Sequence, residues 1–183
     1  NVWQAMKPAE LSLGGFLNQT SSEIRQQVEF PQQTLLALLA YITGKPQTWI
    51  LAHSEAMLSA TQQAKLAALI SRLKQGEPLP YLTSKQEFFG LSFEVSPAVL
   101  IPRPETELLV ETALYWLRRH PTATNALDVG TGSGCIAVSL AVNLPALQII
   151  ATDISAEALA VAQRNAQFHH VVDRIAFQDA DLI

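Results

Sequence analysis

The fold is decided by one stretch of sequence, Leu127-Asp128-Val129-Gly130-Thr131-Gly132-Ser133-Gly134-Cys135. Its apolar start is typical of a buried strand, and its glycine-rich end is typical of a turn that opens a helix. Glycine lets the backbone approach a ligand closely, and the first N–H groups of a helix attract carboxylate or phosphate oxygens. The stretch therefore predicts a binding site for a nucleotide-like ligand at the carboxyl end of a strand.

Acidic residues around this glycine loop indicate which ligand it holds. Asp153 follows the next apolar segment, 19 residues after Gly134, where a carboxylate accepts hydrogen bonds from ribose hydroxyls in nucleotide-binding folds. Asp128 lies two residues before Gly130, and a carboxylate there repels a pyrophosphate but attracts an ammonium or sulfonium group. The strict alternation of the glycines also differs from the G-x-G-x-x-G spacing of dinucleotide sites. These features favour S-adenosylmethionine (SAM); the alternatives are a dinucleotide, a structural glycine turn, and a turn-capping role for Asp128.

The sequence around the loop alternates between strand and helix patterns. Strands are predicted at 126–129, 147–152 and 174–178, and helices at about 134–143 and 156–168. This alternation predicts an α/β, Rossmann-like domain with a parallel sheet. Because such sheets usually have more strands, we expect the sheet to be truncated after its first three. The first strand should then leave an exposed edge that is prone to pairing.

Helical patterns dominate the sequence before residue 77. One helix ends at Gly44, and another begins with a capping box formed by Ser59 and Gln62. Glycine is common just past a helix end, and the capping box satisfies free N–H groups at a helix start. We therefore expect a small N-terminal helical bundle.

A third pattern separates the bundle from the sheet. Aromatic and β-branched residues surround Gly90, which predicts a β-hairpin. The predicted organisation is therefore a helical domain at 1–76, a hairpin linker at 77–100, and the first half of a ligand-binding domain at 101–183.

Composition excludes several classes of protein. Of the 183 residues, 49% are hydrophobic and 15% are charged, which is typical of a globular chain rather than a disordered one. The formal net charge of −4 lacks the basic surplus needed for non-specific binding to nucleic acids or anionic membranes. The single cysteine, Cys135, cannot form an internal disulfide or a zinc cluster, and the apolar stretches are too short to span a bilayer. We expect a cytoplasmic protein with no metal, no direct nucleic-acid partner and no membrane contact.

Three segments together resemble the HemK/PrmC family, the SAM-dependent methyltransferases that modify the glutamine of the Gly-Gly-Gln motif in class 1 peptide release factors. They are Gly76-Glu77-Pro78-Leu79-Pro80-Tyr81 with Glu87-Phe88-Phe89-Gly90, then Leu100-Ile101-Pro102-Arg103-Pro104-Glu105-Thr106-Glu107, and the glycine loop with Asp153. The middle segment is the most specific. A sister family that acts on a ribosomal-protein glutamine has a similar layout but lacks the Pro-Glu-Thr-Glu run, which favours the release-factor branch.

The resemblance implies a role for each part of the predicted site. The methionine end of SAM would be held by Gly130, Thr131, Gly132, Ser133 and Gly134, beside Asp128. Asp153 would bind the ribose, and Asp181 with Leu182 would contact the adenine. A segment before the loop would close over the methionine part, and its candidates are Arg103, Glu105 and Thr106. A solvated acidic loop is the alternative for Asp181, and an ordinary helix start is the alternative for the segment that holds Thr106.

Members of the family also carry an Asn-Pro-Pro-Tyr tetrapeptide, which occurs nowhere in these 183 residues. The resemblance places it shortly beyond Asp181, past Ile183. We therefore expect this polypeptide to be the N-terminal portion of an enzyme and to be inactive by itself. No residue of the chain is assigned to catalysis: Cys135 is expected to be a packing residue, and His169-His170 a solvated helix end.

The implied partner is a class 1 peptide chain release factor, which the N-terminal helices help to engage in the family. The sequence does not predict an oligomeric state. Three other functions are kept as alternatives: a ribosomal-protein glutamine methyltransferase, a dinucleotide-dependent oxidoreductase, and a non-enzymatic interaction module.

Overall fold

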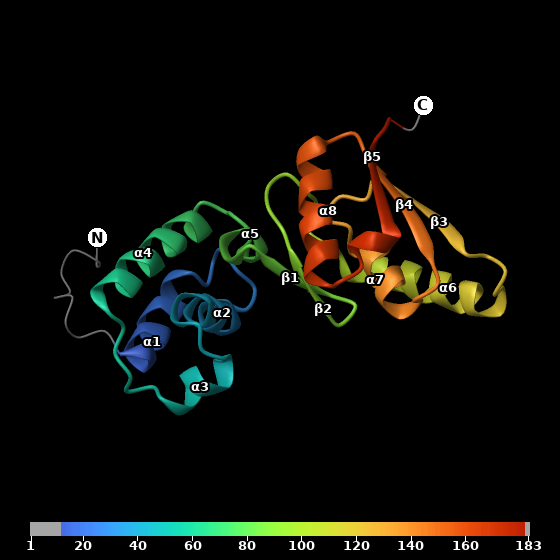
Figure 1. Ribbon diagram of the computed structural model, residues 1–183. Helices are drawn as coiled ribbons and strands as arrows, with labels where there is room; N and C mark the ends of the chain where they lie inside the picture. Colours follow the sequence, from blue (N-terminus) through green and yellow to red (C-terminus); the bar gives the residue numbers. More distant parts are fainter. Residues whose placement is uncertain (1–11, 182–183) are drawn as a thin grey trace. The chain divides into compact units, whose positions relative to one another are not determined.

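Helices build the first part of the chain in the computed structural model, which describes residues 12–181 (Figure 1). They are α1 (Leu13–Glu23), α2 (Pro31–Thr43), α3 (Gln47–Ala52), α4 (Ala60–Lys74) and α5 (Leu79–Thr83). Gly44 ends α2 in the left-handed conformation with φ 67°, and Ser59 and Gln62 form both hydrogen bonds of a capping box at the start of α4. The predicted helical bundle and its boundary signals are therefore confirmed.

A single apolar core holds these helices together. Each helix contributes fully buried side chains, among them Phe16, Leu38, Ile50, Leu66 and Leu82. None of the described helices, in this part of the chain or the next, is both long and apolar enough to cross a lipid bilayer.

The boundary between the two compact units of the chain lies between Thr83 and Ser84. The sequence predicts that the helical domain ends at residue 76 and that a separate hairpin linker follows at 77–100. The structure differs because Leu82 of α5 packs into the helical core, whereas Phe88 and Phe93 of the hairpin are buried in the core of the second unit. Long-range packing of these apolar side chains assigns α5 to the first unit and the hairpin to the second.

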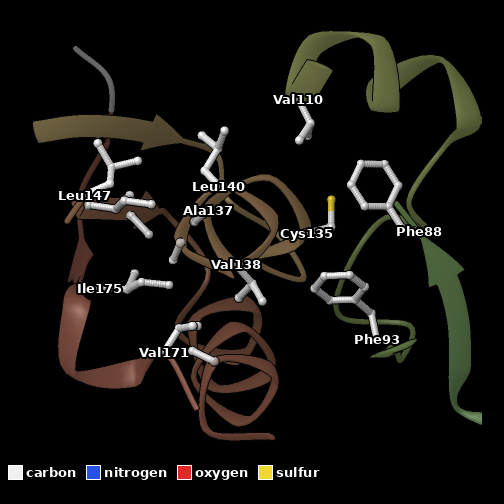
Figure 2. Packing of buried hydrophobic residues seen from close by; sticks show 14 of the residues in the cluster. Phe88, Phe93, Val110, Cys135, Ala137, Val138, Leu140, Leu147, Val171 and Ile175 are labelled. Atoms are coloured by element: carbon white, nitrogen blue, oxygen red, sulfur yellow. The ribbon is translucent and has the colours of Figure 1, made fainter. Parts of the chain in front are cut away.

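The hairpin consists of β1 (Lys85–Phe88) and β2 (Leu91–Glu94), which pair antiparallel as predicted. Phe89 and Gly90 form its turn with φ 51° and 71°, the left-handed geometry of the tight turns that suit strand twist. The carboxylate of Glu107 accepts a hydrogen bond of 2.9 Å from the Phe89 N–H and so supports the less common left-handed conformation of a non-glycine residue. Figure 2 shows Phe88 and Phe93 extending from the hairpin toward Cys135.

Alternating helices and parallel strands follow the hairpin. They are α6 (Pro104–Arg119), β3 (Asn125–Val129), α7 (Cys135–Asn143), β4 (Gln148–Asp153), α8 (Ala156–Phe168), the short 3-10 helix η2 (Val172–Arg174) and β5 (Ile175–Asp179). The described strands of this sheet run in the order β3-β4-β5 and are parallel, so the predicted α/β fold is confirmed. The carboxyl ends of β3, β4 and β5 meet at one edge of the sheet, which is where ligands bind in open α/β folds.

Among residues 12–181, helices cover one face of the sheet and leave the other largely exposed. Ile149, Ala151 and Ile175 are buried beneath α7 and α8. On the opposite face, Leu127 is 64% exposed and its partner in the β3–β4 register, Ile150, is 42% exposed. The open face is apolar, and β3 borders it as an edge strand (Figure 1).

We expect the purified chain to self-associate as its concentration rises, because a hydrophobic edge strand is a template for pairing. Leu127→Lys, which places a charge on that strand, should shift the weight-average mass toward the monomer in sedimentation velocity. Leu51→Lys is the control, because Leu51 is similarly exposed, at 60%, on the helical unit. A sharp monomer boundary for the unmodified chain at high concentration would contradict the expectation.

Candidate cofactor-binding site

The glycine loop connects the end of β3 to the start of α7, as predicted. Gly130 and Gly134 adopt left-handed φ values of 69° and 77°, which side chains with a Cβ rarely adopt. The two positions differ in their surroundings. A Cβ on Gly130 would meet no atom within 4 Å, whereas a Cβ on Gly134 would lie 3.0 Å from the Cβ of Ala162 on α8. Gly130 therefore faces open space, and Gly134 allows the loop to pack directly on α8.

Asp128 lies beneath the loop and is only 8% exposed. One oxygen of its carboxylate accepts hydrogen bonds from the Thr131 hydroxyl at 2.7 Å and from the Ala137 N–H at 3.2 Å. These bonds connect the end of β3 to both the loop and α7. Burial raises the pKa of Asp128, while the bonds from Thr131 and Ala137 oppose the rise and the nearby charge of Asp153 adds to it. The geometry gives Asp128 a loop-positioning role, and direct contact with an ammonium group remains a prediction.

The raised pKa of Asp128 makes the stability of the second unit depend on pH. The folded protein binds this proton more tightly than the unfolded chain does, so Asp128 stabilises the fold at low pH and loses that contribution as pH rises through the raised pKa. In Asp128→Asn, the fall in the free energy of unfolding between acid and neutral pH should therefore be smaller. Urea titrations followed by Trp116 fluorescence, in a chain with Trp3 and Trp49 replaced by Phe, measure it. A slope in Asp128→Asn equal to that of the unsubstituted chain would contradict the prediction.

Asp153 ends β4 beside the loop. Its two carboxylate oxygens accept hydrogen bonds from the Gly132 N–H at 2.9 Å and from the Ser155 N–H at 3.0 Å. A carboxylate has about four acceptor positions, so two such bonds fix its orientation and leave others for a ligand's hydroxyl groups. The structure thus places the predicted ribose-binding residue in contact with the predicted methionine-binding loop.

The chain beyond β5 reaches the same edge of the sheet. Asp179 pairs with Asp153 in the β4–β5 register, and the Ala180 N–H donates a 3.2 Å hydrogen bond to the Asp153 carbonyl oxygen. Asp181 follows and is exposed. Leu182, the other residue predicted to contact adenine, lies outside the described residues. The course of residues 179–181 brings the predicted adenine-binding segment next to Asp153.

Arg103 and Thr106 lie at the start of α6. Arg103 is the exposed N-cap residue in an extended conformation, and its carbonyl oxygen accepts a 3.0 Å hydrogen bond from the Thr106 N–H. Within residues 12–181, neither residue forms a hydrogen bond with the glycine loop. Their position is that of an ordinary helix start, and closure over a ligand remains a prediction.

Asn165 is a further residue at the loop that the sequence analysis does not predict. It lies on α8 with 1% of its surface exposed, and its side chain bonds to the Ser133 carbonyl oxygen of the glycine loop at 2.9 Å. The sequence does contain one sign of this role. Asn165 lies on the apolar face of α8 with Ala158 and Ala162, and asparagine has a low helix propensity. A polar residue at such a position indicates a specific hydrogen-bond partner. The remaining loop residues, Thr131 and Ser133, are buried, so the loop is held from below by Asp128 and from one side by Asn165.

Cys135 belongs to the core rather than to a reactive site. The thiol is buried among apolar side chains near Phe88, Phe93 and Val110 (Figure 2). Burial raises its pKa to about 11, and a thiol that stays protonated at neutral pH is a poor nucleophile. The prediction of a packing residue is confirmed.

The residues at this site fit SAM. The loop offers open space at Gly130 for close approach, and an oriented carboxylate at Asp153 offers acceptors for ribose hydroxyls. No group of His, Cys, Asp or Glu side chains suited to a metal ion is found among residues 12–181.

Two protein-family models match the chain, one for each unit. Residues 16–83 match the model described as the PrmC N-terminal domain, and residues 109–183 match the model described as ribosomal protein L11 methyltransferase (PrmA).

Relatives of known name are similar over most of the chain. The release factor glutamine methyltransferase of Bordetella pertussis is 46% identical, covering 75% of this chain and 50% of that protein. That of Escherichia coli (strain K12) is 44% identical, covering 85% and 55%. That of Chlorobaculum tepidum is 36% identical and covers 100% and 61%. The chain therefore spans about half the length of the curated relatives it matches.

Among solved structures, the N-terminal domain of human METTL16 in complex with SAH is 25% identical, with a TM-score of 0.43 over 51% of this chain and 38% of that one. Both units resemble one family: the first matches the PrmC N-terminal model, and relatives named release factor glutamine methyltransferase are similar across both. The chain belongs to the HemK/PrmC family.

Proposed function

We propose that this chain provides the cofactor-binding part of a SAM-dependent protein-glutamine N-methyltransferase. The proposed substrate is the glutamine of the Gly-Gly-Gln motif in class 1 peptide chain release factors. The observation that carries the proposal is the glycine loop at the end of β3, with the Asp153 carboxylate bonded to the Gly132 N–H at 2.9 Å. The names and identities of the relatives support the choice of substrate.

The residues of this chain bind and orient the methyl donor in this proposal. The loop from Gly130 to Gly134 holds the methionine end, Asp153 accepts hydrogen bonds from the ribose, and Asp181 with Leu182 contacts the adenine. Asp128 acts through Thr131, whose hydroxyl donates to it at 2.7 Å. Such prior orientation lowers the entropic cost of bringing the reacting atoms together.

Chemistry at the acceptor needs groups that these residues do not supply. SAM, when bound, supplies a methyl group that its sulfonium has already activated. The amide nitrogen of glutamine is a poor nucleophile because its lone pair is delocalised, so the enzyme must accept hydrogen bonds from the two amide N–H groups and favour a localised lone pair. We propose that an Asn-Pro-Pro-Tyr motif, absent from residues 1–183, performs this task. Residues 1–183 alone should therefore bind SAM without turnover.

A ribosomal protein is the second candidate substrate, because residues 109–183 match the ribosomal protein L11 methyltransferase model. The first candidate is favoured because the helical unit matches the PrmC N-terminal model. We propose that this helical unit engages the release factor.

The decisive experiment uses the longest natural polypeptide that contains this chain. It is incubated with methyl-labelled SAM and either a purified class 1 release factor or purified ribosomal proteins. We expect label on the release factor, and none when the glutamine of its Gly-Gly-Gln motif is replaced by alanine. Label on a ribosomal protein alone would support the second candidate. Calorimetry that detects NAD binding but neither SAM nor S-adenosylhomocysteine (SAH) binding would instead support an oxidoreductase.

A further inference from the structure

The amide of Asn165 joins three segments that are far apart in sequence. Its Oδ1 accepts a 2.7 Å hydrogen bond from the Glu94 N–H, and its Nδ2 donates to the Glu94 and Ser133 carbonyl oxygens, both at 2.9 Å. Glu94 ends the hairpin, and Ser133 lies in the glycine loop. The buried amide thus has partners for its acceptor and for both N–H donors, the arrangement that makes a buried polar group favourable rather than costly.

The Ser133 carbonyl is a sensitive point of the loop. On one side of it, the Gly132 N–H donates to Asp153, and on the other side Gly134 packs so closely on Ala162 that an added Cβ would lie 3.0 Å from the Ala162 Cβ. Asn165 and Ala162 lie on the same face of α8, so this helix holds the loop by a hydrogen bond and by direct packing. Loss of the hydrogen bond would leave a buried carbonyl without its partner beside the ribose-binding carboxylate.

Arg164 on α8 and His169, the C-cap residue of α8, contact the hairpin without touching the loop. Arg164 forms an ion pair with Glu94 at 2.8 Å, and the His169 ring bonds to the Ser92 carbonyl at 2.8 Å. α8 lies between the hairpin and the sheet (Figure 1). Within residues 12–181, neither Arg164 nor His169 forms a hydrogen bond with the glycine loop, so Asn165 is distinguished from them by its bond to Ser133.

We infer that Asn165 is a positioning residue for the cofactor site: it holds the glycine loop in its ligand-binding conformation by anchoring the Ser133 carbonyl to α8 and the hairpin. The inference deepens the proposed function, since it rests on the loop being the SAM site. It does not make Asn165 a contact of the ligand. A preorganised loop binds its ligand more tightly because less ordering is required on binding.

The test compares variants of residues 1–183. Asn165→Ala removes all three hydrogen bonds, and Asn165→Asp keeps the acceptor for the Glu94 N–H but loses both donors. Arg164→Ala and His169→Ala are matched controls, since they weaken contacts between the same helix and the same hairpin. Two quantities are measured for each: SAH affinity by calorimetry, and the amide NMR signals of Gly132 and Gly134 in the ligand-free protein.

Both Asn165 variants lose the one bond that reaches the glycine loop, from Nδ2 to the Ser133 carbonyl. Loss of that bond should weaken SAH binding about tenfold and shift the loop amide signals. The two controls should retain wild-type affinity and loop signals even where they lower stability. Wild-type affinity and loop signals in Asn165→Asp would overturn the inference. If the wild-type chain itself fails to bind SAH, the cofactor proposal fails, and the ligand-free loop signals still decide whether Asn165 positions the loop.

Discussion

Replacing Asp153 by alanine is expected to weaken SAH binding by about 100-fold or more, because two hydrogen bonds to a charged carboxylate contribute about 1.5–3 kcal/mol each. The same carboxylate accepts hydrogen bonds from the Gly132 and Ser155 N–H groups. Its removal therefore takes away the proposed acceptors for the ribose hydroxyls and also releases the loop. Isothermal titration calorimetry with SAH measures the effect directly.

Asp153→Asn separates these two roles of Asp153. The amide keeps one oxygen that accepts a backbone N–H or a hydroxyl, so this variant should bind SAH with an affinity between those of the wild type and the alanine variant. Asp173→Ala is the control. Asp173 precedes β5 and so lies at the amino ends of the strands, whereas Asp153 lies at the carboxyl end of β4. An alanine variant at 153 that stays folded and binds SAH as tightly as the wild type would contradict ribose binding by this residue.

Replacing Gly134 by alanine is expected to destabilise the second unit by about 2–4 kcal/mol. Roughly 1 kcal/mol comes from forcing a Cβ into the left-handed conformation, and about 1–3 kcal/mol comes from overpacking. The overpacking arises because the new Cβ would lie 3.0 Å from the Cβ and 3.2 Å from the Cα of Ala162. The backbone of α8 cannot move aside as a flexible side chain could.

Gly130→Ala is the matched control, because Gly130 has nearly the same φ but a Cβ added there would have no atom within 4 Å. It should lose only about 1 kcal/mol from the strained φ. Urea unfolding followed by Trp116 fluorescence measures the second unit, and backbone hydrogen exchange in α2 and α4 serves as an internal reference. Equal losses in the two variants would show that contact with α8 adds nothing to the cost at Gly134.

Much of the candidate site follows from local sequence alone. The loop glycines, the strand before them and Asp153 at the end of the next strand are all identified by residue type and spacing. Turn chemistry, helix caps and the alternation of strands with helices depend on neighbours a few residues apart, which a sequence displays directly. For the same reason, Gly44, the capping box at Ser59 and the hairpin turn at Gly90 are evident from the sequence.

The tertiary structure decided what long-range packing controls. Asn165 meets Glu94 across 71 residues and Ser133 across 32 residues, and no local pattern pairs these positions. Burial of Asp128, contact between Gly134 and Ala162, and assignment of the hairpin to the second unit likewise depend on where α8 packs. The sequence thus determined which chemical groups surround the loop, whereas the packing of α8 decided which of them hold it in place, because side-chain contacts between distant segments exist only once the chain has folded.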